Sequence, residues 1–323
     1  MTLPLPPSRL SRRSVLKAAG AAAGAAFVAP MLLRGQAAFA SDVLSQIKTV
    51  KPGKLVIATN GIMPMVDMAD GGFKGIDGEI ISRIAAKLQL EIEPSLMEWG
   101  ATVEAVRSGR ADIVLGNLSW TDKRARVLAL TNPEYYYTSS LAQRKGAIIK
   151  QGPMTIADLT GHSIGAILGS APQAEVNGMD FVSDKKFYDM ADACVRDILA
   201  GRVDFGALDG MQAAYMFQMN PDWDIELVDL VPDPNYPMIS GKLPAVIGVN
   251  PKQLALFDAL NAGLAWLWQT GQIKEILASY GLTSEGYLTP LTEDMRLGID
   301  RDADGKIIGI AEHQTIDFSS IFG

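Results

Sequence analysis

The sequence has few of the side chains on which metal sites, nucleophilic triads and disulfides depend. Its 323 residues include one cysteine, Cys194, and two histidines, His162 and His313. A single cysteine cannot form an intramolecular disulfide, and two histidines argue against a zinc site or a Ser-His-Asp triad. Cys194 falls on the apolar face of a predicted helix, so we interpret it as a small core residue.

After residue 40 the sequence also lacks any apolar run long enough to cross a membrane. The earlier run, 18–33, is rich in Ala and Gly, follows the pair Arg12-Arg13, and precedes a small-residue cleavage signal at 38–40. This order is typical of a twin-arginine signal peptide, although a retained anchor is the alternative. We therefore predict that residues 1–40 are removed and that the mature chain resides in the periplasm.

The mature chain is expected to be strongly acidic. The full sequence has a formal net charge of −7, and residues 1–40 contain five basic side chains and no acid, so the mature chain has −12. This charge argues against nucleic acid or anionic lipid as a partner. The remaining length suits one large or two medium domains, each with its own core.

Strands and helices are predicted to alternate along most of the mature chain. The strand patterns lie at 54–59, 90–94, 111–115, 162–168, 203–208 and 245–249. Amphipathic helices are predicted between them, for example at 79–88 and 189–200. Such alternation is typical of parallel α/β sheets, in which ligands bind at the carboxyl ends of strands.

A polar turn at 116–124 follows one of these strands and leads into a short basic helix. Unpaired backbone N–H groups at a helix start favour an anion, and Ser119 adds a hydroxyl. Arg124 could bind a carboxylate through its planar guanidinium. An ordinary helix cap by Thr121 or Asp122, with Arg124 on the surface, fits these residues equally well.

Two positions in the second half of the chain have a similar ambiguity. Ser170 precedes a predicted helix, where it could help to bind an anion or simply cap the helix. Asp209 ends the strand at 203–208, where its carboxylate could meet a cation or cap the helix that follows. The residues alone leave both pairs of interpretations open.

Six segments occur in a recognisable order: KLVIATNG, FKGIDGEI, SGRADIVLGNLSWTDKRARVLALTNPEYYYTSS, IGAILGS, LAGRVDFGALDG and LAWLWQTGQIKEILASYG. In this order, across residues 51–282, the chain resembles the periplasmic polar-amino-acid solute-binding proteins of ABC importers. The resemblance implies a type II periplasmic-binding-protein fold: two α/β lobes, a mixed sheet in each, and two crossover strands, near 140–144 and 244–250. Lobe 1 would comprise 51–142 plus 245–282, and lobe 2 would comprise 143–244.

The resemblance also implies roles for individual residues. Arg124 matches the arginine that clamps the ligand α-carboxylate, and Ser119 and Ser170 match donors to the same group. Asp209 matches the acid that binds the α-ammonium. The other positions that it places at the ligand are Asn60, Trp99, Asn117 and Leu118. We expect no cofactor, and we expect a monomer that delivers an amino acid or analogue to an ABC permease in the inner membrane.

Some residues depart from the family pattern. The usual aromatic wall after the first strand is missing, and Met63 stands in that region. Asn60 occupies a position where many relatives that bind basic amino acids have an acid. The sequence therefore favours an apolar or uncharged ligand lying against Trp99 and Met63, rather than arginine, lysine or histidine.

Two other classes of function stay open. An enzyme on the same scaffold, such as a cyclohexadienyl-dehydratase-like protein, would need a cleft acid with a raised pKa, and Glu98 and Glu175 are the nearest candidates. A periplasmic partner that passes a ligand signal to a sensor or redox protein is the third class. Residues 283–323, which extend beyond the family's usual end, could serve such a partner.

This C-terminal extension contains a D-x-D-x-D-G pattern. Asp300, Asp302 and Asp304 fit the first half of a calcium loop, but Ala311 stands where the bidentate acid belongs. The favoured prediction is a β-hairpin with an Asp-Gly turn, and the calcium site is the alternative.

Overall fold

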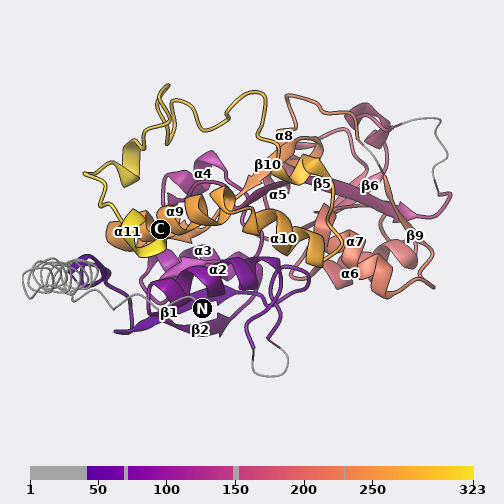
Figure 1. Cartoon of the computed structure of the whole chain (residues 1–323). Helices are drawn as coiled ribbons and strands as arrows, with labels where there is room; N and C mark the ends of the chain where they lie inside the picture. The colour runs from indigo at the N-terminus through magenta and orange to yellow at the C-terminus, as the bar shows by residue number, and fades with distance from the viewer. Residues whose placement is uncertain (1–41, 69–71, 148–152, 229) are drawn as a thin grey trace, which may run out of the picture. The chain divides into compact units, whose positions relative to one another are not determined.

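Short runs of apolar and β-branched residues form the strands of two separate sheets (Figure 1). The computed structural model describes residues 42–68, 72–147, 153–228 and 230–323. The predicted signal peptide, 1–40, lies outside the described residues. Residues 47–323 form one compact unit, and both sheets lie within it.

The first sheet is mixed and has a buried centre. Its strands are β1 (Lys54–Thr59), β2 (Glu91–Leu96), β3 (Ile113–Val114), β4 (Ala129–Leu130) and β11 (Gly248–Val249). They lie in the order β2-β1-β3-β11-β4, with β1 parallel to β2 and β3 and with β11 antiparallel to its neighbours. Five of the six residues of β1 are buried, as expected for a strand covered on both faces.

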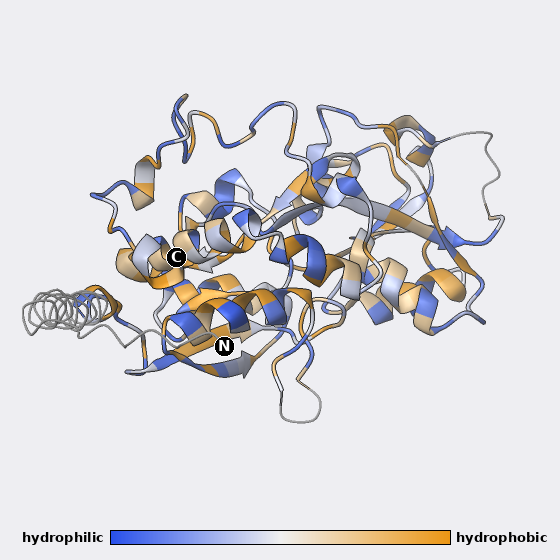
Figure 2. Ribbon diagram, in the orientation of Figure 1, coloured by the Kyte–Doolittle hydropathy of each residue, from blue (hydrophilic) through white to orange (hydrophobic). Residues whose placement is uncertain are grey.

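Amphipathic helices accompany this sheet. They are α2 (Ile76–Lys87), α3 (Trp99–Arg107), α4 (Asp122–Ala125), α9 (Leu254–Gln269) and α10 (Gln272–Ser279). Isoleucines at 76, 80, 81 and 84 place one apolar face of α2 in the core, whereas Lys87 ends the helix with a charge that suits its C-terminus. Figure 2 shows both hydrophobic and hydrophilic residues along these helices, as expected for amphipathic segments.

The second sheet has six strands and is also mixed. They are β5 (Tyr135–Arg144), β6 (Ser163–Ile167), β7 (Asp184–Tyr188), β8 (Phe205–Asp209), β9 (Ile225–Val228) and β10 (Lys242–Ala245). Their order is β10-β5-β8-β6-β7, with β9 also paired to β5. The helices of this part are η2 (Ile156–Leu159), α5 (Gln173–Gly178), α6 (Ala191–Leu199), α7 (Gly210–Met219) and α8 (Pro237–Ser240). The two sheets form the predicted pair of α/β lobes.

Two antiparallel segments connect the lobes. β5 pairs with β10 up to Thr138 and with β8 from Ser139 onward. The change of partner thus precedes the predicted crossover at 140–144. On the lobe 1 side, the Glu134 N–H donates to the Ala245 carbonyl at 2.8 Å, so the two connections run side by side. The exact lobe boundaries at 142 and 245 remain predictions.

The C-terminal extension, 283–323, differs from its predicted form. It contains η3 (Glu285–Leu288), η4 (Gly309–Ala311) and α11 (Ser319–Phe322), and no strand is present in these residues. The predicted β-hairpin is therefore wrong. The Asp-Gly turn does form, but only the single bridge Arg301–Ile307 flanks it. The Arg301 side chain is buried and donates to the Leu130 carbonyl at 3.2 Å, so contacts with lobe 1 replace a regular ladder.

None of the described helices has both the length and the apolar composition that a membrane span requires.

Candidate ligand-binding site

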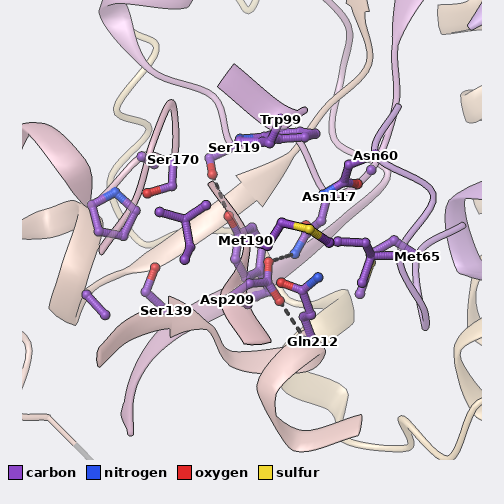
Figure 3. Close-up of a pocket in the computed structure, with 18 of the residues that line it drawn as sticks. Asn60, Met65, Trp99, Asn117, Ser119, Ser139, Ser170, Met190, Asp209 and Gln212 are labelled. Carbon is purple, nitrogen blue, oxygen red and sulfur yellow. Dashed lines mark hydrogen bonds between the residues drawn. The ribbon is translucent and has the colours of Figure 1, made fainter. Parts of the chain in front are cut away.

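A pocket between the lobes contains seven of the eight predicted site residues (Figure 3). They are Asn60, Trp99, Asn117, Ser119, Arg124, Ser170 and Asp209. They come from the carboxyl ends of β1, β2, β3, β6 and β8 or from the turns and helices that follow these strands, where an α/β sheet places its ligands. The eighth, Leu118, does not line the pocket.

Leu118 is a correction to the predicted site. Its side chain is fully buried in the lobe 1 core, and its carbonyl accepts a hydrogen bond from the Val246 N–H at 2.8 Å. The turn therefore alternates, with Asn117 and Ser119 facing the pocket and Leu118 facing the core. An apolar residue between two polar ones is the signal that could have predicted this orientation.

The backbone N–H groups at the start of the turn are already bonded to a protein acid. Asp77, fully buried on α2, accepts hydrogen bonds from the N–H groups of Gly116 at 3.1 Å and Asn117 at 2.5 Å. Its other oxygen accepts from the Tyr135 hydroxyl at 2.6 Å. Asn117 can hold its left-handed φ of 53° because these bonds fix it. These two N–H groups, expected to face an anion, instead shape the turn.

Asp77 was missed by the sequence interpretation, although it lies within the quoted segment FKGIDGEI. The available signal was an acid beside the buried face of an otherwise apolar helix, because such an acid needs internal donors. Burial raises the pKa of Asp77 to about 6, and its hydrogen bonds oppose that shift.

Gly116 is required by its neighbours as well as by its φ of 128°. A Cβ atom at this position would lie 3.3 Å from Cζ3 of Trp99 and 3.5 Å from Oδ1 of Asn60. Both of these residues line the pocket, so the absence of a side chain at 116 lets them approach the turn.

Arg124 is buried and is hydrogen-bonded to both lobes. Its side chain donates from Nη1 to the Ser119 carbonyl at 2.7 Å and from Nη2 to the Gly169 carbonyl of lobe 2 at 2.7 Å. The guanidinium carbon lies 5.9 Å from the centre of the Trp99 ring. No described carboxylate forms an ion pair with it, and burial lowers its pKa to about 10.

Of the alternative interpretation, the ordinary helix cap is confirmed and the surface position of the arginine is wrong. The Thr121 hydroxyl caps α4 by accepting from the Arg124 N–H at 3.2 Å. The Arg124 side chain, however, is only 7% exposed, so the surface position is wrong. A buried guanidinium whose protein partners are carbonyl groups has its charge uncompensated, which favours an incoming anion.

Hydroxyl groups from both lobes lie near this arginine. The Ser119 hydroxyl is hydrogen-bonded to the hydroxyl of Tyr137 on β5, and burial raises the pKa of Tyr137. The Ser170 hydroxyl is buried and has no partner among the described residues. Pro172, rather than Ser170, occupies the N-cap of α5, so Ser170 does not cap that helix.

Asp209 has the capping role that the sequence left open, and its side chain also faces the pocket. Its carboxylate caps α7 by accepting from the Gln212 N–H at 2.9 Å, and it also accepts from Asn117 Nδ2 across the cleft (Figure 3). Burial raises the pKa of Asp209 to about 6. The Oδ1 atom of Asn117 is buried without a partner among the described residues.

The rest of the pocket wall is mainly apolar, and most of it was missed. Met63, the predicted wall residue, does not line the pocket, whereas Met65 does. The lining residues absent from the prediction include Ile62, Met65, Tyr137, Ser139, Ile167, Met190 and Gln212. Tyr137 and Ser139 lie at alternate positions of β5, and that period of two was a usable signal in the quoted segment EYYYTSS.

The two acids considered for an enzyme lie outside this pocket. Glu98 is exposed just before α3 and lines a neighbouring hollow at the mouth of the cleft. The Glu175 carboxylate accepts from the N–H groups of Met238 at 2.9 Å and Ile239 at 3.0 Å, so it holds the start of α8. Neither acid is placed to act on a ligand in the pocket.

The calcium alternative is also wrong. Asp300 turns inward, where its carboxylate accepts from Arg296 Nη2 at 2.8 Å and Trp120 Nε1 at 2.9 Å. Asp302 accepts from the N–H groups of Asp304 and Lys306, which makes it a turn residue. The described residues contain no cluster of three potential metal-ligating side chains. An acid neutralised by a buried arginine is a poor ligand for calcium.

Comparison with known proteins agrees with this geometry. Residues 55–283 match the family model of the bacterial extracellular solute-binding proteins, family 3. The chain is 27% identical over 159 residues to the lysine/arginine/ornithine-binding periplasmic protein of Escherichia coli, covering 47% of this chain and 58% of that protein. It is 26% identical over 150 residues to the probable amino-acid-binding protein YxeM of Bacillus subtilis, covering 46% and 55% respectively.

The match to each of these two relatives therefore spans little more than half of the relative's length. The structure resembles a solved ABC uptake transporter substrate-binding protein from Streptococcus pneumoniae, with a TM-score of 0.65 and 18% identity over 77% of this chain and 98% of that one. That likeness confirms the two-lobed type II periplasmic-binding-protein fold. The match to the family model extends over most of the chain, and on that basis the protein belongs to the bacterial extracellular solute-binding proteins of family 3.

Proposed function

We propose that this protein captures a small zwitterion, an amino acid or a close analogue, and delivers it to an ABC importer. One observation carries this proposal: the buried Arg124, which has no carboxylate partner among the described residues, lines the same pocket as a half-buried acid, Asp209. An amino acid has a carboxylate and an ammonium on neighbouring atoms and would compensate both charges at once.

The carboxylate end of the ligand would lie at Arg124. A guanidinium has five N–H donors, and the two bonds to carbonyl groups leave others available for a two-pronged contact. Ser170 supports this orientation from lobe 2, because its buried hydroxyl has no partner among the residues that the structure describes and can donate to the same carboxylate. Ser119 can contribute its hydroxyl, which it already shares with Tyr137.

The ammonium end would lie at Asp209. An ammonium beside this carboxylate would lower its raised pKa. The Oδ1 atom of Asn117, which no described group contacts by a hydrogen bond, offers a further acceptor. Asn117 therefore lies between the two charged groups. Its side chain contacts Asp209, and its backbone belongs to the turn that leads to Arg124.

The ligand side chain is proposed to be uncharged. Trp99, Met65 and Ile62 form an apolar wall, and Asn60 provides a neutral polar group beside them. Residue 60 is an asparagine, so this position offers no acid to pair with a cationic ligand side chain. The sequence analysis reached the same conclusion from this position. Asp189 lines the pocket but is exposed, so water screens its charge.

We further propose that the lobes comprise 51–142 plus 245–282 and 143–244, and that they open and close about the two connections. The contacts of Arg124 with Gly169 and of Asn117 with Asp209 join the lobes across the pocket, as expected of the closed form. The family, the predicted signal peptide and the acidic charge support a monomer in the periplasm whose partner is an inner-membrane permease.

Binding can be tested with the purified mature chain and a panel of the standard amino acids. The preferred ligand should raise the melting temperature by several degrees, since a ligand that binds only the folded state stabilises it by mass action. Its decarboxylated and deaminated analogues should each lose most of the shift, because each lacks one of the two charges. A panel without any shift would contradict the proposal.

One observation favours a second candidate, an enzyme on the same scaffold. Asp209 is a pocket acid whose pKa is raised to about 6, which is the property that a general acid or base requires. Incubation with cyclic carboxylic acids, followed by mass spectrometry, distinguishes the two functions. Turnover that disappears in Asp209→Asn would favour the enzyme, whereas unchanged recovery of a bound amino acid favours transport.

A further inference from the structure

The C-terminal extension leaves lobe 1 after α10, reaches the strands that connect the lobes and returns to lobe 1. Its first part, η3, packs against β5, and Lys242 Nζ on β10 donates to the Thr289 carbonyl. Its last part, α11, packs against α9, as Figure 1 shows in yellow. The extension therefore contacts lobe 1 and both connecting strands.

Between these two ends the extension inserts charged side chains into lobe 1. Arg296, Asp300 and Arg301 are each 4% exposed. Arg296 donates from Nη1 to the Thr131 carbonyl at 2.6 Å and from Nη2 to the Leu130 carbonyl at 2.7 Å. Leu130 and Thr131 lie just before β5, the first connection, so these contacts hold the segment that leads into β5.

Asp300 links Arg296 and Arg301 of the extension to Trp120 of lobe 1. Its oxygens accept from Arg296 Nε at 3.0 Å and Nη2 at 2.8 Å, while Arg301 donates to its backbone carbonyl at 2.8 Å. The same carboxylate accepts from Trp120 Nε1 at 2.9 Å. Because the acid is compensated by arginine, it can be buried and still orient the indole.

Trp120 belongs to the turn that bears the ligand-binding groups. It directly follows Ser119 and precedes α4, which bears Arg124. Its backbone N–H donates to the Pro244 carbonyl at 3.0 Å, on the second connection. The indole of Trp120 thus joins the extension to the turn, and the backbone of Trp120 joins the turn to the second connection.

We propose that the extension is a brace of the binding site, in which Asp300 acts through Trp120 as a positioning residue for the turn at 116–124. The brace holds Ser119 and Arg124 against the second connection, so that a ligand meets a pre-formed site. This role rests on the proposed function of those two residues as ligand contacts, and it requires no additional partner for the extension.

Trp120→Phe tests the brace with a small change. It removes the indole N–H and keeps an aromatic ring in the core, while Asp300 stays paired with Arg296. The affinity for the panel amino acid that most stabilises the wild type should fall by roughly 3- to 30-fold, the range found for residues that couple to a site without touching its ligand. Amide hydrogen exchange at 116–124 should accelerate in the ligand-free protein.

Phe322→Ala is the matched control within the extension. Phe322 is 4% exposed and packs against Trp266 of α9, with ring centres 5.7 Å apart, at a distance along the chain from the brace contacts. It should lower the melting temperature while leaving affinity and exchange at 116–124 unchanged.

Unchanged affinity and unchanged exchange in Trp120→Phe would overturn the brace, and so would an equal loss of affinity in Phe322→Ala. If the wild type binds no member of the panel, the proposed function fails, while the exchange comparison still decides whether the extension positions the turn.

Discussion

The Nη2 group of Arg124 donates a hydrogen bond across the cleft to the carbonyl of Gly169 at 2.7 Å. The guanidinium of Arg124 thus lines the pocket and also joins lobe 1 to lobe 2. Binding of a carboxylate and closure of the lobes would therefore be coupled at one side chain. The coupling leads to specific expectations for variants on each side of the contact.

Arg124→Met should weaken binding by at least about 100-fold, because it leaves the ligand carboxylate buried without a counter-charge. Isothermal titration calorimetry with the preferred amino acid measures the loss. Arg126→Met is the matched control, since Arg126 lies two residues away on the surface, pairs with Asp122 at 3.0 Å, and should not affect affinity. Retained binding in Arg124→Met would show that the carboxylate lies elsewhere.

Gly169→Ala should impair closure. A Cβ atom at 169 would lie 2.7 Å from the Gly100 Cα of lobe 1, so the lobes could not approach as closely, and affinity should fall about tenfold or more. Gly161→Ala is a close control, because its φ of 78° matches the 76° of Gly169 and nothing lies within 4 Å of its Cβ position. Both variants should lose a similar amount of stability, and equal affinities would refute the closure argument.

Ligand affinity should depend on pH through Asp209. Its pKa in the free protein is about 6, and only the ionised carboxylate attracts an ammonium. Below pH 6 a proton must leave when the ligand binds, so affinity should fall roughly tenfold per pH unit there and stay level above pH 7. In Asp209→Asn the affinity should be lower and independent of pH. A dependence that persists would assign the titration to Asp77, whose pKa is also raised to about 6.

Glu134→Gln should stabilise the protein at neutral pH. Glu134 is fully buried, both of its carboxylate oxygens lack a partner among the described residues, and burial together with the charge of Asp77 raises its pKa well above the ordinary value. Because the folded state holds the proton more tightly than the unfolded state, stability falls as pH rises above the ordinary glutamate pKa of 4.5.

The neutral amide removes this dependence, so the free energy of unfolding at pH 8 should rise by about 1–3 kcal/mol, with little change at pH 4. Urea unfolding at both pH values measures the difference. Glu104→Gln provides the comparison, because Glu104 is exposed and forms its ion pair with Arg107 within its own helix. A gain in Glu134→Gln that is equal at both pH values would contradict the ionisation argument.

Much of the fold could be predicted from local patterns. The strand at 54–59 is reproduced by β1, and the family order of segments correctly implied two lobes with mixed sheets. Seven of the eight predicted site residues line one pocket, because strand ends and helix starts are visible in the sequence and an α/β fold brings them together. The β-hairpin and calcium alternatives for the extension failed because its pattern of acids and alternating residues fits several structures equally well.

The sequence by itself determined the class of fold, seven of the residues that line the cleft and the surplus of acidic charge. The tertiary structure alone decided how the polar groups are paired. Asp77 accepts from the N–H groups of Gly116 and Asn117, Asp300 accepts from Trp120 Nε1, and Arg124 has no carboxylate partner in the described part of the chain. Secondary structure follows from neighbours a few residues apart. The partners of Asp77 and Trp120 instead lie far along the chain, and Arg124 faces the pocket, where a ligand can bind.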